Sequence, residues 1–284
     1  MNLLAPPRRK DHTPGTKFMN HSQDTTHPQE PDTWVSVLIC SHNTHGIYIR
    51  DCLDSIGRQV GGLGVELVWI NDGSDQNSTL LLESQLQEFI QSAHSTRLVY
   101  HRNPLNIGLG ATLNLGVSLC TCELILRMDS DDIMTPNRIQ MQVEFMRKNP
   151  DCVMSGANLL MFRTVLAPDG KSTKPELIQQ TNHPQEITID WVRATRSEWF
   201  MNHPTLIYRK SAVLSVGNYN PDLRYSEDYD LQLKVLKKYG RLRNMPDVLL
   251  YYRMHEGQVT YGGKSSTPAN KLARYRMQET LFSP

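Results

Sequence analysis

Residues 123–132 read ELILRMDSDD, a mostly apolar run that ends in a cluster of aspartates. A short apolar run is typical of a strand that is buried on both faces of a parallel sheet. Two earlier segments have the same form. Residues 35–40 read VSVLIC and are followed by SHN, and residues 65–70 read VELVWI and are followed by NDGSD. In each segment, polar residues begin where a predicted strand ends.

Helical segments separate these strands. Apolar residues recur at helical spacing over 47–59, 78–93 and 106–120, and a further short strand is predicted over 97–101. Strands that alternate with helices in this way form right-handed βαβ units. We therefore predict an α/β fold with a mostly parallel sheet flanked by helices. Ligands of such sheets bind outside the carboxyl ends of the strands, where the polar clusters lie.

The second half of the chain continues the alternation. Its segments are assigned in order to a helix (from Pro136 to about Lys148), a strand (152–162), a helix and a strand (187–208), an amphipathic helix (229–239) and a last strand (248–252). Residues 163–186 are polar and contain proline, which predicts a long loop or an acceptor-side insertion.

The composition also predicts where the ordered domain begins and ends. From Pro6 to Asp32 the chain is rich in proline, histidine, threonine, glutamine and charge, so residues 1–33 are predicted to be a disordered tail. A single domain is predicted over 34–262. Beyond it the chain turns polar again, and residues 263–284 are interpreted as a C-terminal tail.

The overall composition argues against several classes of protein. The formal net charge of +1 gives no sign of the basic surface that a nucleic-acid-binding protein needs. The five cysteines include no Cys-x-x-Cys pair, so we expect reduced thiols in a cytoplasmic protein. The N-terminus lacks the apolar core of a signal peptide, and no stretch approaches the roughly 18 apolar residues of a transmembrane helix. Any membrane contact is therefore expected to be peripheral.

The aspartates that follow residue 128 form the most informative cluster. Carboxylates gathered at one sheet edge repel one another unless a cation or hydrogen-bond donors compensate their charge. Hard cations that bridge phosphates are commonly held by one or two carboxylates, so we interpret Asp129, Asp131 and Asp132 as a Mg²⁺ or Mn²⁺ site that serves a diphosphate. The alternative is a solvated Asp-rich turn or helix cap. An EF-hand is disfavoured because Met134 stands where its loop requires glycine.

Residues 71–73 read NDG, which is normally a hairpin signal, but a predicted helix follows them. A turn between a strand and a helix is therefore favoured. An aspartate in such a turn can accept hydrogen bonds from a base or a ribose, and Gly73 lets the backbone approach a ligand closely. The same residues also make a good turn and helix cap without any ligand, so Asp72 is a candidate nucleotide contact with a structural alternative.

The order of these motifs resembles that of the family 2 glycosyltransferases, which have the GT-A fold. The resemblance rests on a series of motifs between Val35 and Thr260, namely VLICSHN (37–43), NDGS (71–74), NxG (106–108), DSDD (129–132), HPT (203–205), VGxY (216–219), ED (227–228) and YRxH (252–255). It implies a Rossmann-like domain with a nucleotide-sugar-binding half over 34–135 and an acceptor-side half over 136–262.

The resemblance also implies roles for the matching residues. It implies that Asp129 contacts the ribose and that Asp131 and His255 bind the metal. It implies that Asp228 is the general base, with Glu227 as the next candidate. By family habit, the resemblance also makes uridine the expected base of the donor. The nucleotide sugar is then expected to be bound by Ser41, His42, Asn43, Asp72, Asn106, Asp129 and Ser130.

Two departures from the family pattern concern the donor. Several relatives have an aromatic residue at the position of His42, where stacking on the base is expected. The basic residue that follows the Asn-x-Gly motif in the family is replaced here by Leu109 and Gly110, so the usual source of a phosphate contact is missing. Asn106 itself has an alternative role as a helix cap.

Together these features predict an inverting glycosyltransferase that moves a sugar from a nucleotide-sugar donor to a hydroxyl of a glycan, lipid or protein acceptor. A divalent cation stabilises the charge on the leaving diphosphate, and Asp228 takes the proton of the attacking hydroxyl. The alternatives are structural. Glu227 and Asp228 begin a predicted helix, where its dipole favours acids, and loop histidines such as His255 are often surface residues.

Other nucleotide-binding classes fit less well. A dehydrogenase needs Gly-x-Gly-x-x-Gly after the first strand, where CSHN stands at 40–43, and a P-loop sequence is absent. A sugar nucleotidyltransferase usually has a Gly-rich basic loop at that place, which this chain also lacks. A catalytically silent module that binds a nucleotide sugar or a glycan is the alternative from a different class, but it would not need Asp131, Asp228 and His255 together.

Overall fold

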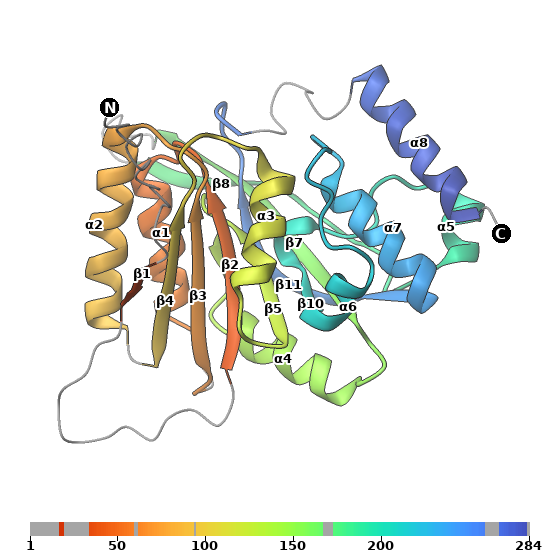
Figure 1. Ribbon diagram of the computed structural model, residues 1–284, viewed down its shortest axis with the longest axis horizontal. Coiled ribbons are helices and arrows are strands. Elements are labelled where there is room, and N and C mark those ends of the chain that lie inside the picture. Colours follow the sequence, from red (N-terminus) through yellow and green to blue (C-terminus); the bar gives the residue numbers. More distant parts are fainter. Residues whose placement is uncertain are drawn as a thin grey trace, which may run out of the picture.

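The computed structural model describes residues 17–19, 34–59, 62–93, 95–166, 173–258 and 267–282. These residues form one large sheet with helices on both faces (Figure 1). The strands are β1 (Lys17–Met19), β2 (Trp34–Ser41), β3 (Gly64–Asn71), β4 (Thr96–Arg102), β5 (Leu124–Asp129), β6 (Ile133–Met134), β7 (Met154–Leu166), β8 (Thr173–Gln180), β9 (Glu186–Thr188), β10 (Ile207–Arg209) and β11 (Arg241–Arg253). The helices are α1 (Gly46–Gly57), α2 (Gln76–Ser92), α3 (Leu109–Leu119), α4 (Arg138–Lys148), α5 (Ile189–Thr195), α6 (Lys210–Ser215), α7 (Glu227–Tyr239), α8 (Pro268–Phe282) and the short 3-10 helix η1 (His203–Thr205).

Four neighbouring strands, in the order β4, β3, β2 and β5, form the parallel part of the sheet. β3 is buried along its whole length, as expected of a strand covered on both faces. Ser41 at the end of β2 lies opposite Asn71 on β3, and Cys40 lies opposite Asp129 on β5. The three strands therefore end side by side, and the polar turns that follow them open onto one edge of the sheet.

Beyond β5 the strands change direction. β10 is antiparallel to both β5 and β7, whereas β11 is parallel to β7. The short β6 follows the aspartate cluster and pairs with β11, with Ile133 opposite Tyr251. This pairing brings residues 253–255 next to residues 129–132, although the two segments are far apart in the sequence.

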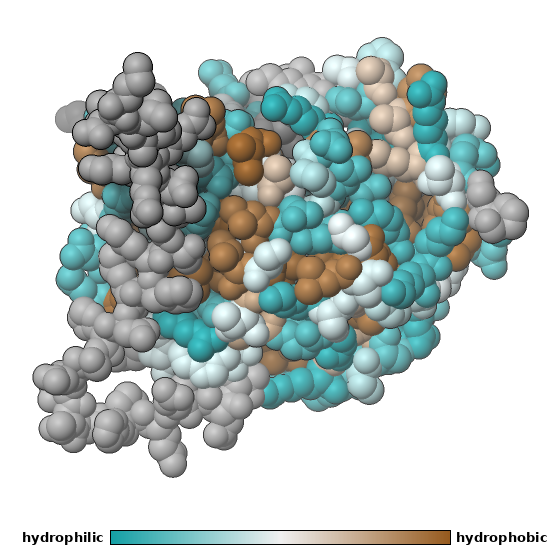
Figure 2. Space-filling model, in the orientation of Figure 1, coloured by the Kyte–Doolittle hydropathy of each residue, from teal (hydrophilic) through white to brown (hydrophobic). Residues whose placement is uncertain are grey.

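The helices divide between the two faces of the sheet. α1, α2 and α4 pack on one face, where Ile49, Leu82 and Val143 belong to one core cluster. α3 and α7 pack on the other face, where Leu113 and Leu231 belong to a second cluster. Figure 2 shows the side of the molecule that carries α3, on which polar and apolar surface alternate and apolar atoms gather near α3. Among the described helices, none is long and apolar enough to cross a lipid bilayer.

The predicted α/β class and the mostly parallel sheet are confirmed. The main difference lies in residues 163–186, for which the sequence predicts a long loop or an acceptor-side insertion and no strand. There β7 continues to Leu166 and β8 pairs with it in an antiparallel hairpin, followed by β9. Every residue of β8 is exposed, so its sequence has no apolar alternation that could reveal a strand.

The structure bears differently on the two segments that were predicted to be tails. The tail over 1–33 lies outside the described residues except for Lys17–Met19, which pair with β4. Over 263–284, where no element was predicted, the structure contains α8. This helix packs against α7, because the side chain of Gln278 donates a hydrogen bond to the hydroxyl of Tyr229 at 2.6 Å and Leu281 joins the core.

The buried end of α8 should contribute to stability. Leu281 is 5% exposed, whereas Leu272 on the same helix is 50% exposed. Leu281→Ala should lower the free energy of unfolding by about 2 kcal/mol because it leaves a cavity, whereas Leu272→Ala should change it by less than about 0.5 kcal/mol. Urea denaturation of the two variants measures the difference. Equal effects would mean that α8 does not pack against the domain.

Candidate active site

The turns after β2, β3 and β5 meet at the carboxyl edge of the sheet, next to the start of α7 and the end of β11. Two hydrogen bonds link the turns directly. The hydroxyls of Thr44 and Ser130 lie 2.8 Å apart, and the N–H of Asn43 donates to the hydroxyl of Ser74 at 2.9 Å. These contacts hold polar residues from three separate parts of the chain as one surface.

Each aspartate after residue 128 has a different partner. A carboxylate oxygen of Asp129 lies 2.5 Å from Nη2 of the buried Arg127. Oδ2 of Asp131 lies 2.8 Å from Nε2 of His255, so the two predicted metal ligands are in contact. Asp132 is fully buried, and its Oδ1 accepts a hydrogen bond from the N–H of residue 253 at 3.0 Å. Its Oδ2 has no partner among the described residues.

Arg253 fixes this arrangement from the end of β11. Its guanidinium lies over the rings of Tyr48 and Phe162, at 4.5 and 4.9 Å from their centroids. It donates a hydrogen bond to the carboxylate of Asp51 at 2.7 Å and another to the carbonyl of Asp131 at 2.9 Å. Arg253 therefore ties α1, β7 and β11 to the aspartate turn, two residues before His255.

The aspartate turn has the composition of a site for a hard cation. Ligand oxygens of Asp129, Asp131 and Asp132 all lie within 4.8 Å of one another. Burial, followed by repulsion from Asp131, raises the pKa of Asp132 well above its usual range, and burial also raises the pKa of Asp129. Crowded carboxylates and an orphaned buried oxygen are what a divalent cation compensates, so these residues fit Mg²⁺ or Mn²⁺.

Asp72 organises the neighbouring loop. One of its carboxylate oxygens accepts hydrogen bonds from the side chain of Asn103 at 2.8 Å and from the N–H of Ile107 at 3.0 Å, and the other accepts one from the N–H of Gly108 at 3.0 Å. The residue is 4% exposed. Three of its acceptor positions are thus engaged by the loop, whereas the N-cap of α2 is Asp75. A contact between Asp72 and the nucleotide base stays a prediction.

The turn after β2 contains both buried and accessible candidates. Ser41 is buried, and its hydroxyl accepts a hydrogen bond from the indole N–H of Trp69 at 2.8 Å. His42 and Asn43 are exposed. Nδ1 of His42 lies 2.9 Å from the carbonyl oxygen of Asp72, which orients the ring. Asn43 has a left-handed backbone with φ of 50°, a conformation that asparagine tolerates well.

Of the other two residues predicted to contact the nucleotide, one is buried and one is exposed. Ser130 is buried against Thr44, so its hydroxyl already has a protein partner. Asn106 is exposed and makes no hydrogen bond within the described part of the chain. It does not cap α3, whose N-cap residue is Gly108. Asn106 is therefore available to a ligand at this edge.

Glu227 and Asp228 begin α7. Glu227 is buried, and burial together with the neighbouring Asp228 raises its pKa to about 7. Asp228 is partly exposed and accepts a hydrogen bond from the N–H of Tyr229 at 2.8 Å, while burial raises its pKa. A carboxylate with a raised pKa is a stronger proton acceptor once it is ionised. The start of α7 lies against α3, because a Cβ on Gly110 would lie 3.2 Å from that of Glu227.

Two arginines of this site were not singled out from the sequence. The pairing of Arg127 with Asp129 could have been predicted. A charge inside an apolar strand is rarely buried without a partner, and residues 127 and 129 share one face of that strand. For Arg253, the only indication in the sequence was its place in the YRxH motif. The rings of Tyr48 and Phe162 that it contacts come from segments with no recognisable motif.

His203, which belongs to the HPT motif, has a structural position. It is 8% exposed, and its Nε2 lies 2.9 Å from the hydroxyl of Tyr219. Burial lowers its pKa well below the usual range, so the ring is neutral near pH 7. His203 is thus a hydrogen-bonded core histidine.

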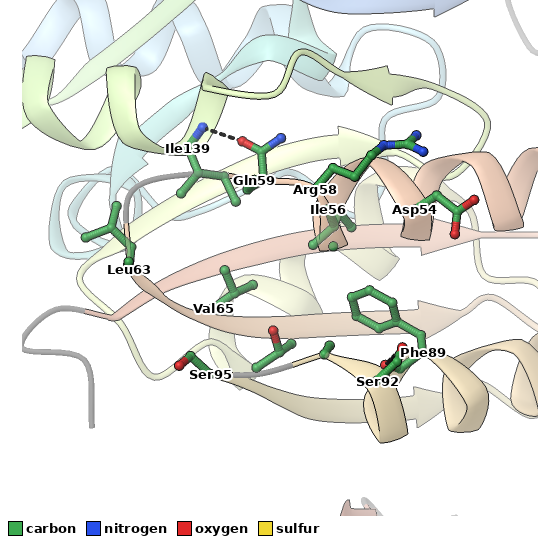
Figure 3. A pocket seen from close by; sticks show the side chains of 14 residues that line it. Asp54, Ile56, Arg58, Gln59, Leu63, Val65, Phe89, Ser92, Ser95 and Ile139 are labelled. Carbon is green, nitrogen blue, oxygen red and sulfur yellow. Dashed lines mark hydrogen bonds between the residues drawn. The ribbon is translucent and has the colours of Figure 1, made fainter. Parts of the chain in front are cut away.

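A cavity of about 570 Å³ lies at the opposite edge of the sheet (Figure 3). It is lined by the ends of α1 and α2 and by the beginnings of β3 and β4, with Val65, Phe89 and Ser95 among its residues. Gln59 accepts a hydrogen bond from the N–H of Ile139 at its rim. None of the candidate site residues lines this cavity, so it is separate from the carboxyl edge.

Comparison with known proteins shows which family the chain resembles. Residues 36–213 match the model of the family described as glycosyl transferase family 2. The chain is 31% identical over 247 residues to the amylovoran biosynthesis glycosyltransferase AmsE of Erwinia amylovora, covering 87% of this chain and 86% of that protein.

Two solved structures share the fold. The structure of residues 1–349 of S. aureus TarS in complex with UDP superposes with a TM-score of 0.63 at 17% identity, covering 88% of this chain and 65% of that one. The mannosyltransferase PcManGT of Pyrobaculum calidifontis, in complex with GDP-Man and Mn²⁺, superposes with a TM-score of 0.56 at 15% identity, covering 84% and 62%.

The close contact at Gly73 provides a test of the site's packing. Gly73 has φ of 66°, and a Cβ there would lie 2.2 Å from the carbonyl carbon of Leu105, whereas Gly62 has φ of 64° and open space around it. Gly62→Ala should cost about 1 kcal/mol of unfolding free energy through backbone strain alone. Gly73→Ala should cost a further ~1–3 kcal/mol because the loop must move. Chemical denaturation compares the two, and equal losses would contradict the close approach.

Proposed function

The chain belongs to glycosyltransferase family 2, and we propose that it is an inverting, metal-dependent enzyme that moves a sugar from a UDP-linked donor to a hydroxyl group of its acceptor. The observation that carries this proposal is the 2.8 Å contact between Asp131 and His255, which are 124 positions apart. Asp131 lies in the turn after β5, and His255 follows β11. Their meeting at the carboxyl edge supports a shared ligand at the place where α/β sheets bind ligands.

Asp131 and His255 are the proposed metal ligands. Asp129 and Asp132 lie close enough to Asp131 to complete a carboxylate-rich surface around the ion. When bound, Mg²⁺ or Mn²⁺ would neutralise negative charge on the diphosphate as its bond to the sugar breaks. The Mn²⁺ in the complex of the Pyrobaculum mannosyltransferase supports a divalent cation for this chain.

The donor is proposed to lie along the turns after β2, β3 and β5. UDP in the TarS complex supports a uridine nucleotide. We propose that His42, Asn43 and Asn106, which are exposed, contact the nucleotide, and that the partly exposed Asp129 contacts its ribose. The buried members of the predicted set act by shaping the site, since Ser41, Asp72 and Ser130 already hydrogen-bond within the protein.

Asp228 is proposed to be the general base. As an ionised carboxylate at the start of α7, it would accept the proton of the acceptor hydroxyl while the hydroxyl oxygen attacks the anomeric carbon. The diphosphate leaves from the opposite side, so a single displacement inverts the anomeric centre. Burial raises the pKa of Asp228, so its ionised carboxylate has a higher proton affinity than that of an ordinary aspartate, which supports this role.

The acceptor is proposed to approach from the half that contains residues 136–262. A hydroxyl of a glycan, of a lipid-linked glycan or of a protein would meet the chemical requirement of Asp228. We propose that the enzyme works in the cytoplasm and that a lipid-linked acceptor would bring it only to the membrane surface.

Binding of UDP should depend on a divalent cation, because the carboxylates at this edge otherwise repel the diphosphate. Calorimetric titration of the protein with UDP in Mn²⁺ should show an affinity that falls at least about tenfold in chelator, which corresponds to about 1.4 kcal/mol. Asp131→Ala should bind UDP as weakly in Mn²⁺ as the unaltered protein does in chelator.

Two controls accompany this titration. Asp190→Ala removes an exposed aspartate of α5 and should bind UDP normally. Asp72→Ala should weaken UDP binding even at high Mn²⁺, because it releases the 103–108 loop without touching the metal. UDP binding that is unchanged by chelator would remove the metal from the mechanism.

Asp228→Asn should reduce turnover by about 10² to 10⁴, because the amide keeps the size of the side chain but cannot accept a proton. UDP affinity should barely change. In the unaltered enzyme the rate should fall as pH drops through the pKa of the base, and this fall should occur at a higher pH than for an ordinary aspartate, since burial raises the pKa of Asp228.

Asp230→Asn is the matched control for this prediction. Asp230 lies in the same first turn of α7 and pairs with Lys234 at 2.9 Å, so its loss should affect stability slightly and turnover little. A sugar-transfer assay with a panel of nucleotide sugars compares the variants. Near-normal transfer by a folded Asp228→Asn protein would sink this mechanism and make Glu227 the next candidate.

A further inference from the structure

The loop between α6 and α7 is anchored firmly to α3. The side-chain amide of Asn114 on α3 donates a hydrogen bond to the carbonyl of Tyr219 at 2.6 Å. The amide of Asn218 donates in return to the carbonyl of Asn114 at 2.9 Å. These reciprocal bonds fix the first part of the loop against the helix that follows the Asn-x-Gly motif.

The next part of the loop also lies against α3. A Cβ on Gly110 would lie 2.8 Å from the carbonyl oxygen of Asn220 and 3.2 Å from that of Leu223, so the loop rests directly on the start of α3. At its end, the N–H of Ser226 donates to the carboxylate of Glu227 at 3.0 Å. Only a residue without a side chain at position 110 permits this approach.

Arg224 extends from this fixed loop toward the Asn-x-Gly motif. Its Nε lies 3.9 Å from the position that a Cβ on Gly108 would take, so the side chain lies beside the loop that Asp72 holds. Arg224 is exposed and makes no hydrogen bond or ion pair with the described residues. It is four positions before Asp228.

The candidate site is rich in carboxylates, so a phosphate bound there would need a positively charged partner. Asp129, Asp131 and Asp228 are acidic, and a diphosphate would be repelled by them. The buried arginines of the site do not compensate this repulsion, because their charges are already paired. Arg127 pairs with Asp129, and Arg253 pairs with Asp51 on α1. An exposed guanidinium that has no carboxylate partner is the complementary group.

We propose that Arg224 binds the diphosphate of the donor and takes over the role of the basic residue that the Asn-x-Gly loop lacks at Leu109 and Gly110. The inference rests on the proposed function, since it assumes a nucleoside diphosphate at this edge. The planar guanidinium can donate two parallel hydrogen bonds to one phosphate, which an ammonium group cannot do in the same geometry. The contacts of the loop with α3 fix the backbone that carries Arg224, so only the side chain has to be ordered when the donor binds.

Calorimetric titration with UDP and with uridine, both in Mn²⁺, tests this assignment. Arg224→Gln should weaken UDP binding by about 10-fold or more, the usual effect of losing a charged hydrogen bond. Uridine, which has no phosphate, should bind equally to the variant and the unaltered protein. Arg224→Lys should give an intermediate UDP affinity, because it keeps the charge and loses the paired hydrogen bonds.

Arg276→Gln is the matched control, since Arg276 is an exposed arginine on α8, and it should leave both titrations unchanged. The melting temperature of each variant checks that it is folded. Normal UDP binding by Arg224→Gln would overturn the inference and leave the proposed function intact, and so would an equal loss of UDP and uridine binding. Failure of the unaltered protein to bind UDP would instead overturn the UDP donor, and this inference with it.

Discussion

Repulsion between carboxylates at the carboxyl edge of the sheet is the constraint around which the structure is organised. Asp129, Asp131 and Asp132 follow one strand, and Glu227 and Asp228 begin a helix beside them. Burial raises the proton affinity of most of these groups, because a charged carboxylate loses its hydration in the protein. A fold that keeps such a cluster must hold its members apart, pair them, or offer them to a cation.

Buried arginines supply part of the compensation. Arg127 is almost completely buried beside Asp129, and Arg138 is fully buried beneath the same turn. Arg138 donates to the carbonyl of Arg127 at 2.7 Å and to the side chain of Gln142 at 2.9 Å, and burial lowers its pKa to about 9. Burying a cation is costly and rarely gains stability over an apolar core. Here the two arginines fix the strand end that carries the carboxylates, since Arg127 pairs with Asp129 and Arg138 binds the carbonyl of Arg127.

The parallel half of the fold was accessible from the sequence because its strands are buried on both faces and therefore read as apolar runs. The same reasoning could not find β8, whose residues are all exposed, or α8, which contributes few residues such as Leu281 to the core. The aspartate cluster and His255 were found through motifs. The engagement of Asp72 with its loop was not predicted in detail, because sequence alone does not show which acceptors a buried carboxylate satisfies. Arg224 stands at no recognised motif position and becomes visible only when two loops are placed together.

One short pairing joins these observations into a single site. β6 begins immediately after Asp132, so its pairing with β11 fixes where the aspartate turn ends. The same strand β11 ends at Arg253, whose backbone N–H binds Asp132 and whose side chain binds the carbonyl of Asp131. His255 follows at once and meets the carboxylate of Asp131. Because both proposed metal ligands are positioned by one strand pairing, the site cannot be complete until the last strand has joined the sheet. This dependence couples the proposed metal site to the folding of the whole domain, because Asp131 lies near the middle of the chain and His255 follows β11.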